Sequence, residues 1–212
     1  TLWTHDPHEI EMLSTKREQQ EKLPGVKLPD NIAIEADLET ALTDEDVVVM
    51  AVPSPVVRTV AKQMSPFVKD GQIIVNVAKG IEDVTYKTLS DIIEEEIPNA
   101  EVCVLSGPSH AEEVGIGIPT TVVIGAKNKK TAEMLQDVFM NKVFRVYTSS
   151  DIIGIELGGA LKNVIALAAG TVDGLGYGDN TKAALMTRGI AELTRLGEAM
   201  GGKPETFSGL TG

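Results

Sequence analysis

The sequence predicts an α/β fold, in which a doubly wound parallel sheet is followed by an all-helical unit. Two observations lead to this prediction. In residues 1–150, short apolar runs rich in β-branched residues alternate with amphipathic segments, and after Ser150 only helical patterns remain. Continuous apolar runs are typical of strands that are buried on both faces of a parallel sheet. Their alternation with helices indicates right-handed crossovers between parallel strands.

Each apolar run predicts one strand. The predicted strands are Asp46–Val52, Ile73–Val77, Val102–Leu105, Thr121–Ile124 and Val143–Tyr147, and Leu2–Trp3 is expected to be the tail of another. Apolar residues at helical spacing predict two helices between strands, at Leu89, Ile92, Ile93 and Ile97 and at Ala132, Leu135, Val138 and Phe139.

A domain boundary is expected near Ser150, so that residues 1–150 and 151–212 form separate units. In the second unit we expect one helix from about Ile152 to Val172 and another that follows a cap at Asp179 or Asn180. The second helix should end near Met200, because two glycines follow it.

The sequence is expected to be a fragment. It opens on Leu2–Trp3 leading directly into His5-Asp6-Pro7, as if a strand were entering a helix, and it closes on Gly209-Leu210-Thr211-Gly212. A Gly-x-Gly-x-x-Gly segment after a strand occurs nowhere in it. We therefore expect the first strand of the sheet and its glycine-rich phosphate loop to be missing.

Composition argues against several classes of partner. The chain has 19 Lys and Arg against 31 Asp and Glu, and its net charge of -12 disfavours binding to nucleic acid or anionic lipid. Cys103 is the only cysteine, which fits a reducing compartment. The opening residues lack a signal-peptide pattern, and the longest apolar segment is interrupted by Glu156, Lys162 and Asn163. We expect a cytoplasmic protein without membrane insertion.

Lys162 is the strongest candidate for chemistry. Residues 152–169 around it are apolar or small on every side of the predicted helix, so burial on nearly all sides is expected. Burial favours the neutral amine and shifts the pKa of Lys162 toward a useful acid–base range. Gly158 and Gly159 lie one turn earlier and would leave room for a small ligand. The alternatives are a structural ion pair with Glu156 or a side chain that extends to the surface.

Two further features follow predicted strands. Lys79 lies just past a carboxyl end, which is the edge where open α/β sheets bind ligands, although a solvated loop lysine has the same pattern. In the segment 104–113, Pro108 suits the first position of a helix whose free N–H groups could hold an anion, although such turns are common as plain architecture. His5 and His8 have metal-like spacing but no third ligand, so no metal site is expected.

Several motifs in one order carry a family resemblance. They are Leu2–Asp6, Val52–Ser54, Ala78–Gly80, Ser106–Ala111, Gly158–Val164, Asp173–Ala184 and Thr187–Gly189. Over essentially its whole length, the chain resembles the bacterial NAD(P)-dependent glycerol-3-phosphate dehydrogenases. The resemblance implies a Rossmann-type domain, an all-helical substrate domain, and NADP or NAD as cofactor. It also implies interconversion of dihydroxyacetone phosphate and sn-glycerol 3-phosphate for glycerophospholipid synthesis. We further expect a homodimer.

The resemblance also implies roles for individual residues. Lys162 would be the acid–base residue, and Lys79 would contact both substrate and cofactor. The other substrate contacts would be Gly107, Ser109 and Asn163, and the other cofactor contacts His5 and Ala111. A histidine at position 5 leaves room for a 2′-phosphate and so favours NADPH, whereas the neighbouring Asp6 keeps NADH as an alternative.

Two other functions stay open at this point. One is a related dehydrogenase that acts on a β-hydroxyacid or ketopantoate, and the other is a non-catalytic cofactor-binding fragment. The Lys162-Asn163 pair favours the glycerol phosphate enzyme, and the presence of both Lys79 and Lys162 argues against a pure binder. The family's Arg-Asn segment for the substrate phosphate would follow Gly212. We therefore expect this chain alone to be inactive and the full gene product to be active.

Overall fold

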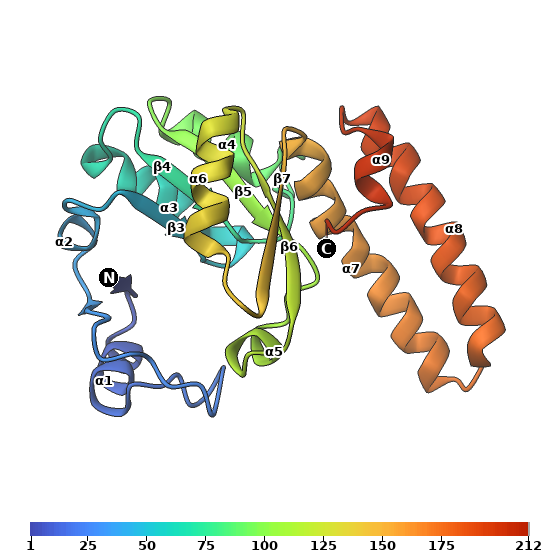
Figure 1. Cartoon of the computed structure of the whole chain (residues 1–212), viewed down its shortest axis with the longest axis horizontal. Coiled ribbons are helices and arrows are strands. Elements are labelled where there is room, and N and C mark those ends of the chain that lie inside the picture. Colours follow the sequence, from blue (N-terminus) through green and yellow to red (C-terminus); the bar gives the residue numbers. More distant parts are fainter. Residues whose placement is uncertain (212) are drawn as a thin grey trace.

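The computed structural model describes residues 1–211. Figure 1 shows a twisted sheet with helices on both sides and a long helical hairpin that extends from one end. The strands are β1 (Leu2–Trp3), β2 (Ile34–Glu35), β3 (Val47–Met50), β4 (Ile73–Asn76), β5 (Glu101–Ser106), β6 (Thr120–Gly125) and β7 (Phe144–Ser149). The helices are α1 (Pro7–Lys16), α2 (Leu38–Leu42), α3 (Val57–Met64), α4 (Leu89–Glu96), α5 (Ala111–Gly115), α6 (Lys129–Phe139), α7 (Ile152–Gly174), α8 (Gly178–Ala199) and α9 (Pro204–Phe207), with short 3-10 turns at Ser54–Val56 and Ser65–Phe67.

The five strands predicted from apolar runs form one sheet in the order β3-β4-β5-β6-β7. Strands β3, β4 and β5 are mutually parallel, but β6 runs antiparallel to β5, with Leu105 opposite Ile124. The expectation of a purely parallel sheet is wrong at this pair. Only the short α5 and loops join the two strands, so the chain re-enters the sheet from the edge at which it left.

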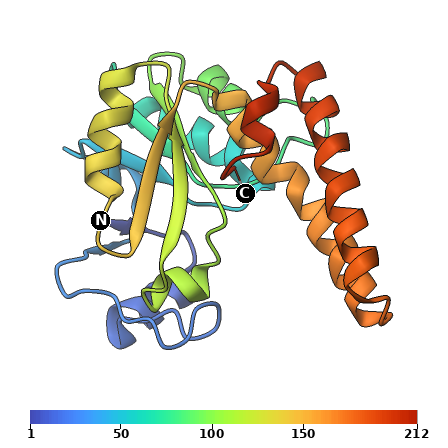
Figure 2. The same cartoon turned by 45° about the vertical axis from the view of Figure 1, so that its right-hand side comes forward.

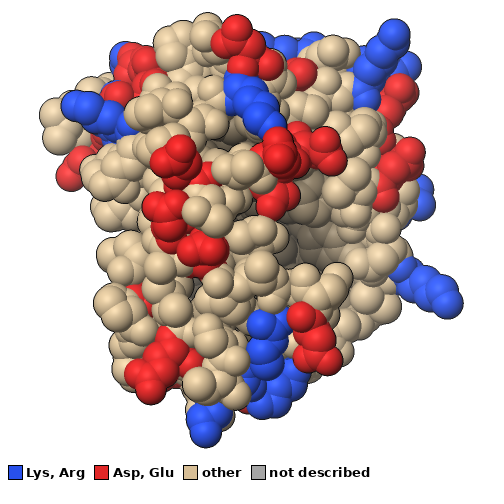
Figure 3. Space-filling view, turned by 90° about the vertical axis from the view of Figure 1, so that its left-hand side faces the viewer, with Lys and Arg blue, Asp and Glu red and all other residues tan. Residues whose placement is uncertain are grey.

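Strands β1 and β2 form a separate two-stranded parallel sheet, with Leu2 opposite Ile34. Strand β2 was not predicted, because it has only two residues, too few for a periodic signal. A cavity of about 470 Å³ lies between the two sheets and is lined by Trp3 and Val48, among others. Figure 3 shows the side of the molecule that carries α1 and α2, where acidic side chains are prominent and the surface is hollowed near its centre.

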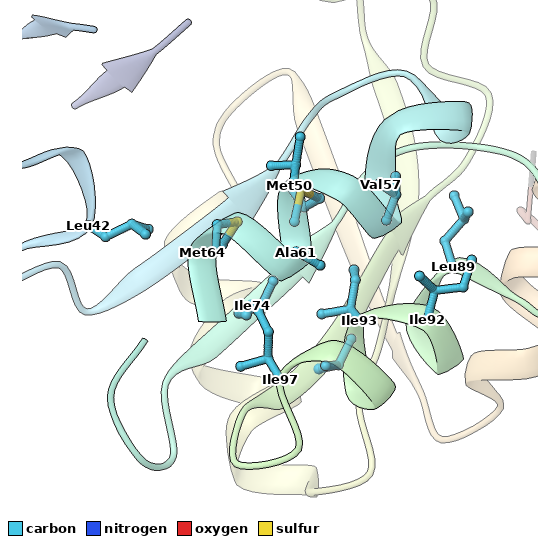
Figure 4. Packing of buried hydrophobic residues seen from close by; sticks show 12 residues of the cluster. Leu42, Met50, Val57, Ala61, Met64, Ile74, Leu89, Ile92, Ile93 and Ile97 are labelled. Carbon is cyan, nitrogen blue, oxygen red and sulfur yellow. The ribbon is translucent and has the colours of Figure 1, made fainter. Parts of the chain in front are cut away.

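The sheet is covered on both faces, as a doubly wound fold requires. Successive residues of a strand point to opposite faces, so Ile74 packs with Ile93 of α4 and with α3, whereas Val75 packs with Leu135 of α6. Figure 4 shows the first of these clusters, with α3 and α4 against β3 and β4. Cys103 lies in the second cluster, and burial, with a smaller effect of Glu101, raises the pKa of its thiol to about 12.

Helix α7 connects the sheet to the helical hairpin. Asp151 caps it by accepting a hydrogen bond from the Gly154 N–H at 3.1 Å. Its first half is buried beside the sheet, but its second half runs past the sheet and packs against α8, as Figure 2 shows. Leu167 there is 77% exposed, so the expectation of burial on nearly all sides was wrong for this half.

By length and composition alone, α7 is also long and apolar enough to cross a membrane. The expectation that no segment qualifies was wrong, because Glu156 and Lys162 are too few charges to break the apolar run.

Helix α8 starts at Gly178, just before its predicted cap, and ends at Ala199, as predicted. The short α9 was not predicted.

Candidate active site

A cleft of about 780 Å³ lies between the carboxyl edge of the sheet and the α7–α8 hairpin. It brings together five of the predicted site residues, which come from three separate parts of the chain: Lys79, Ser109, Ala111, Lys162 and Asn163. His110 and Glu112 also line the cleft, and its far end is apolar, with Ile165, Ala166, Met186 and Ile190. The cleft therefore combines a polar, lysine-bearing end with an apolar wall.

Lys79 is held in the cleft by the turn after β4. The Asn76 side chain closes this turn, because its Oδ1 accepts from the Ala78 N–H at 3.1 Å and its Nδ2 donates to the Ala78 carbonyl at 3.3 Å. The Lys79 amine donates to the Gly107 carbonyl at 2.7 Å. Burial lowers the pKa of Lys79. Lys79 is thus a partly desolvated cation just past the end of β4.

Glycine follows Lys79 for a steric reason. A Cβ on Gly80 would lie 2.8 Å from the Ser54 side chain, and the residue has a φ of +151°. The turn after β4 therefore lies directly against the turn after β3.

Lys162 reaches the same cleft from α7. Its amine donates to the Gly209 carbonyl and to the Thr211 hydroxyl, both at 3.1 Å. Burial, and to a lesser extent the nearby charge of Lys79, lowers the pKa of Lys162. The structural ion pair with Glu156 does not form, because that carboxylate binds Asn76 and Ser90 instead.

The glycines before Lys162 serve packing. A Cβ on Gly158 would lie 2.2 Å from the Thr211 Oγ1, and one on Gly159 would lie 2.6 Å from the Ser106 Oγ. The expected room for a ligand is therefore absent at Gly158, where Thr211 occupies it, whereas Gly159 lines the cleft. Both residues instead let α7 approach the sheet and the segment after α9 closely.

The turn after β5 supplies Gly107 and Ser109. The Gly107 carbonyl accepts from Lys79, and it also accepts from the Ser109 hydroxyl at 3.2 Å. A Cβ on Gly107 would lie 2.8 Å from the Thr121 carbonyl, so only glycine fits beside β6. Helix α5 starts at Ala111, so the prediction that Pro108 occupies its first position was wrong.

Two predicted site residues, Asn163 and His5, are exposed and are not held in the cleft by close contacts. Asn163 lines the cleft but is exposed, and its amide donates only a long hydrogen bond of 3.5 Å to the Gly159 carbonyl. His5 lies at the end of β1, exposed and with its ring 6.1 Å from that of Trp3, and it is not among the residues that line the cleft.

Four residues near the lysines were missed by sequence reasoning. They are Glu156, its two partners Asn76 and Ser90, and Thr211, which binds Lys162. A charged residue inside an apolar helix was a usable signal for Glu156. No signal existed for Thr211, because 49 residues separate it from Lys162 and only tertiary folding brings the two together.

The carboxyl edge of the sheet fits a dinucleotide cofactor. The turns after β3, β4 and β5 lie side by side, and each contacts the next. Gly80 lies against Ser54, and the Lys79 amine donates to the Gly107 carbonyl. These turns form one continuous edge that carries Lys79. Extended anionic nucleotides bind at such edges in open α/β sheets.

Comparison with known proteins identifies the family. Residues 1–132 match the model of the NAD-dependent glycerol-3-phosphate dehydrogenase N-terminus, and residues 151–212 match that of its C-terminus. Glycerol-3-phosphate dehydrogenase [NAD(P)+] of Agathobacter rectalis is 63% identical over 211 residues, which cover 100% of this chain and 63% of that protein. The Fusobacterium nucleatum enzyme of the same name is 58% identical over 214 residues, covering 100% of this chain and 64% of that protein.

Solved structures agree with this comparison. The glycerol-3-phosphate dehydrogenase of Coxiella burnetii superposes with a TM-score of 0.94 at 33% identity, over 100% of this chain and 65% of that chain. The yeast enzyme gives a TM-score of 0.86 at 28% identity, over 99% of this chain and 64% of that chain. This chain thus spans a little under two thirds of the length of these relatives, and it belongs to the NAD-dependent glycerol-3-phosphate dehydrogenase family.

Proposed function

We propose that the full-length protein interconverts dihydroxyacetone phosphate and sn-glycerol 3-phosphate with NADPH or NADH, and that it supplies the glycerol backbone of phospholipids. The observation that carries the proposal is the pair of partly buried lysines in one cleft, Lys79 and Lys162, each with a lowered pKa. Two cations at one end of a cleft, on a chain with a net charge of -12, form a local site for an anionic phosphoester.

Lys162 is proposed as the acid–base residue. In the reducing direction its ammonium donates a proton to the ketone oxygen, and in the oxidising direction its neutral amine accepts the proton of the hydroxyl. When bound, the nicotinamide supplies or takes up the hydride at the adjacent carbon. An ammonium has three N–H bonds, and Gly209 and Thr211 accept from this amine within the described residues. A further N–H can then point into the cleft.

The remaining substrate contacts are proposed at the turn after β5 and on α7. Lys79 provides positive charge beside the phosphoester, and the Ser109 hydroxyl and the Gly107 backbone are next to it. Asn163 follows Lys162 on the cleft side of α7 and offers an amide to the substrate hydroxyls. A small polyol phosphate needs this mixture of cation, hydroxyl and amide.

The cofactor is proposed to extend from Ala111 and Lys79 along the carboxyl edge toward His5. Asp6 supports a preference for NADPH, because its carboxylate is already engaged as the cap of α1 and accepts from the His8 N–H at 2.9 Å. An engaged carboxylate is a poorer partner for a ribose 2′-hydroxyl, and exposed His5 leaves space for a 2′-phosphate. The ratio of kcat/KM for NADPH to that for NADH tests this preference.

The decisive experiment is an assay of the full-length protein with dihydroxyacetone phosphate and each cofactor. Wild-type protein should oxidise the cofactor, and Lys162→Ala should lose about a hundredfold to ten-thousandfold in kcat while cofactor binding is retained. Lys127→Ala is the matched control, because this lysine is exposed, pairs with Glu94 and does not line the cleft. Turnover only with a β-hydroxyacid or ketopantoate would contradict the proposed substrate. Cofactor binding without any turnover would indicate a pure binding protein.

We also propose that residues 1–150 form the cofactor domain and 151–212 the start of the substrate domain, in a cytoplasmic homodimer without membrane insertion. Burial of Ile155, Leu157 and the Glu156 carboxylate in the first half of α7 supports a packed helix rather than a membrane span. Sedimentation velocity of the full-length protein tests the dimer. Cell fractionation with vesicle flotation tests the location.

A further inference from the structure

Glu156 is the most deeply buried carboxylate near the cleft, at 4% exposure in the first half of α7. Its Oε1 accepts from the Ser90 N–H at 3.0 Å and from the Asn76 Nδ2 at 3.2 Å, and its Oε2 accepts from the Ser90 hydroxyl. A buried carboxylate with this many donors is costly to assemble, and nothing in the proposed proton transfer uses it.

The partners of Glu156 connect it to both lysines. On its own helix, Glu156 lies six residues before Lys162, so its contacts fix the part of α7 from which Lys162 enters the cleft. Across the contact, Asn76 is the residue that closes the turn carrying Lys79, through its two hydrogen bonds to Ala78. One Asn76 side chain therefore contacts the helix of one lysine and the turn of the other.

Ser90 gives the arrangement a third anchor. It lies in the first turn of α4, and its hydroxyl is 3.2 Å from that of Thr88, the cap of the helix. Helix α4 packs in the core on one face of the sheet. The Glu156 carboxylate thus joins α7, the end of β4 and the start of α4 at one point.

We propose that Glu156 and Asn76 are a positioning pair that fixes Lys162 and Lys79 relative to each other in the cleft. The inference rests on the proposed function only where it predicts a loss of activity. The prediction that the two amines move apart does not depend on that function. Neither residue of the pair touches the cleft, so both act through the lysines.

The test compares Glu156→Gln with Glu156→Leu and Asn76→Ala in the full-length protein. Glutamine keeps the shape, offers an oxygen to Asn76 and to the Ser90 N–H, and can donate to the Ser90 hydroxyl, so kcat should stay within about threefold of wild type. Leucine keeps the volume but removes every acceptor. Glu156→Leu and Asn76→Ala should each lower kcat by about tenfold to a hundredfold, because small misplacements of reacting groups are costly.

A second readout separates positioning from general loss of structure. The titration of the Lys162 side chain is followed by NMR, with its signal assigned through Lys162→Arg. Loss of the pair lets the two amines separate and hydrate, so the pKa of Lys162 should rise in Glu156→Leu and in Asn76→Ala but not in Glu156→Gln. The other charged or titratable groups that line the cleft, His110 and Glu112, are unchanged in all three variants.

Ile155→Ala is the matched control, because it removes a fully buried side chain from the same turn of α7 on the side that packs against Val104 and Val123. It should lower the melting temperature without moving the titration of Lys162. If it moves that titration as far as Glu156→Leu does, general packing positions the helix and the proposal is wrong. It is equally wrong if Glu156→Leu and Asn76→Ala titrate and turn over like wild type.

The outcomes also separate this inference from the proposed function. An inactive wild-type protein would contradict the function, whereas the NMR titration would still decide the positioning pair. If Glu156→Leu does not fold, Asn76→Ala carries the same two readouts. In the double variant with Glu156→Leu, Asn76→Ala should lose less activity than the sum of the two single effects, since the two residues act through one contact.

Discussion

The Lys162 amine lies 3.1 Å from the hydroxyl of Thr211, a residue that follows α9. Thr211 is almost fully buried, and its hydroxyl in turn donates to the Thr206 carbonyl at 3.3 Å. The hydroxyl therefore acts as a fixed acceptor that limits where the lysine amine can point. Glycine at positions 158 and 159 of α7 permits this contact, because a side chain at either position would crowd Thr211.

Thr211→Val in the full-length protein should lower kcat for dihydroxyacetone phosphate reduction by about fivefold. Valine keeps the shape and removes one hydrogen bond to the amine, and one such bond contributes about 1 kcal/mol. Steady-state kinetics measures the effect, and Thr211→Ser, which keeps the hydroxyl, should recover most of the loss. A Thr211→Val enzyme as active as wild type would show that Gly209 alone orients the amine.

The pH profile should report the interaction between the two lysines. Reduction needs the ammonium form of Lys162, so its rate should fall as the pH rises through the pKa of that residue, which burial and then the charge of Lys79 hold below the usual value. Lys79→Met removes the neighbouring charge. The pKa of Lys162 should then rise, and the basic limb of kcat/KM should move to higher pH.

Lys127→Met serves as the control for this profile, because Lys127 is exposed and pairs with Glu94. Its basic limb should coincide with that of wild type. A limb that stays in place or moves to lower pH in Lys79→Met would mean that the charge of Lys79 does not act on Lys162.

The strands and the main helices could be predicted because their signals are local. β-branched apolar runs predicted β3 to β7, and the apolar spacing around Leu135 predicted α6, which packs where that spacing requires. The direction of β6 could not be predicted this way. It depends on the route of the chain through α5, and no periodic pattern in the strand records that route.

The candidate site was predictable where a residue had an unusual local setting. Lys162 was notable because it interrupts an apolar helix, and Lys79 because it ends a strand. No local sequence pattern marks the supporting residues Asn76, Ser90 and Thr211. They matter only through contacts with residues far away in the chain. The exposure of the second half of α7 was missed for a related reason, because composition gives no information on where the sheet ends.

Gly197→Ala should destabilise the helical hairpin. A Cβ on Gly197 in α8 would lie 1.9 Å from the Cζ of Phe207, a rigid ring that is 1% exposed. Overpacking of this kind costs about 1–3 kcal/mol, and each kcal/mol lowers the melting temperature by about 2–4 °C in a protein of this size. Thermal unfolding followed by circular dichroism measures the shift.

Gly170→Ala is the control for that substitution. Gly170 also lies inside a long helix, α7, but a Cβ there would meet nothing within 4 Å. Alanine should therefore stabilise this helix by about 0.5–1 kcal/mol, since glycine is entropically unfavourable in a helix interior. Equal effects of the two substitutions, in either direction, would contradict the predicted clash with Phe207.

The ionisation of buried Glu156 should make the free energy of unfolding depend on pH. The Glu156→Gln substitution should remove this dependence. Burial raises the pKa of Glu156 above its ordinary value of 4.5, although hydrogen bonds from Ser90 and Asn76 oppose the shift. Well below pH 4.5 the carboxyl is protonated in both the folded and the unfolded chain. As the pH rises further, the unfolded chain releases this proton first, so folding loses stability until the folded carboxyl also ionises. Glutamine has no proton to release. The melting temperature of Glu156→Gln minus that of wild type should therefore increase as the pH rises above 4.5. Glu113→Gln, which removes an exposed carboxylate of α5, is the comparison variant for the loss of one charge. A difference for Glu156→Gln that falls with pH would mean that hydrogen bonding outweighs burial, and that the folded protein prefers the ionised carboxylate.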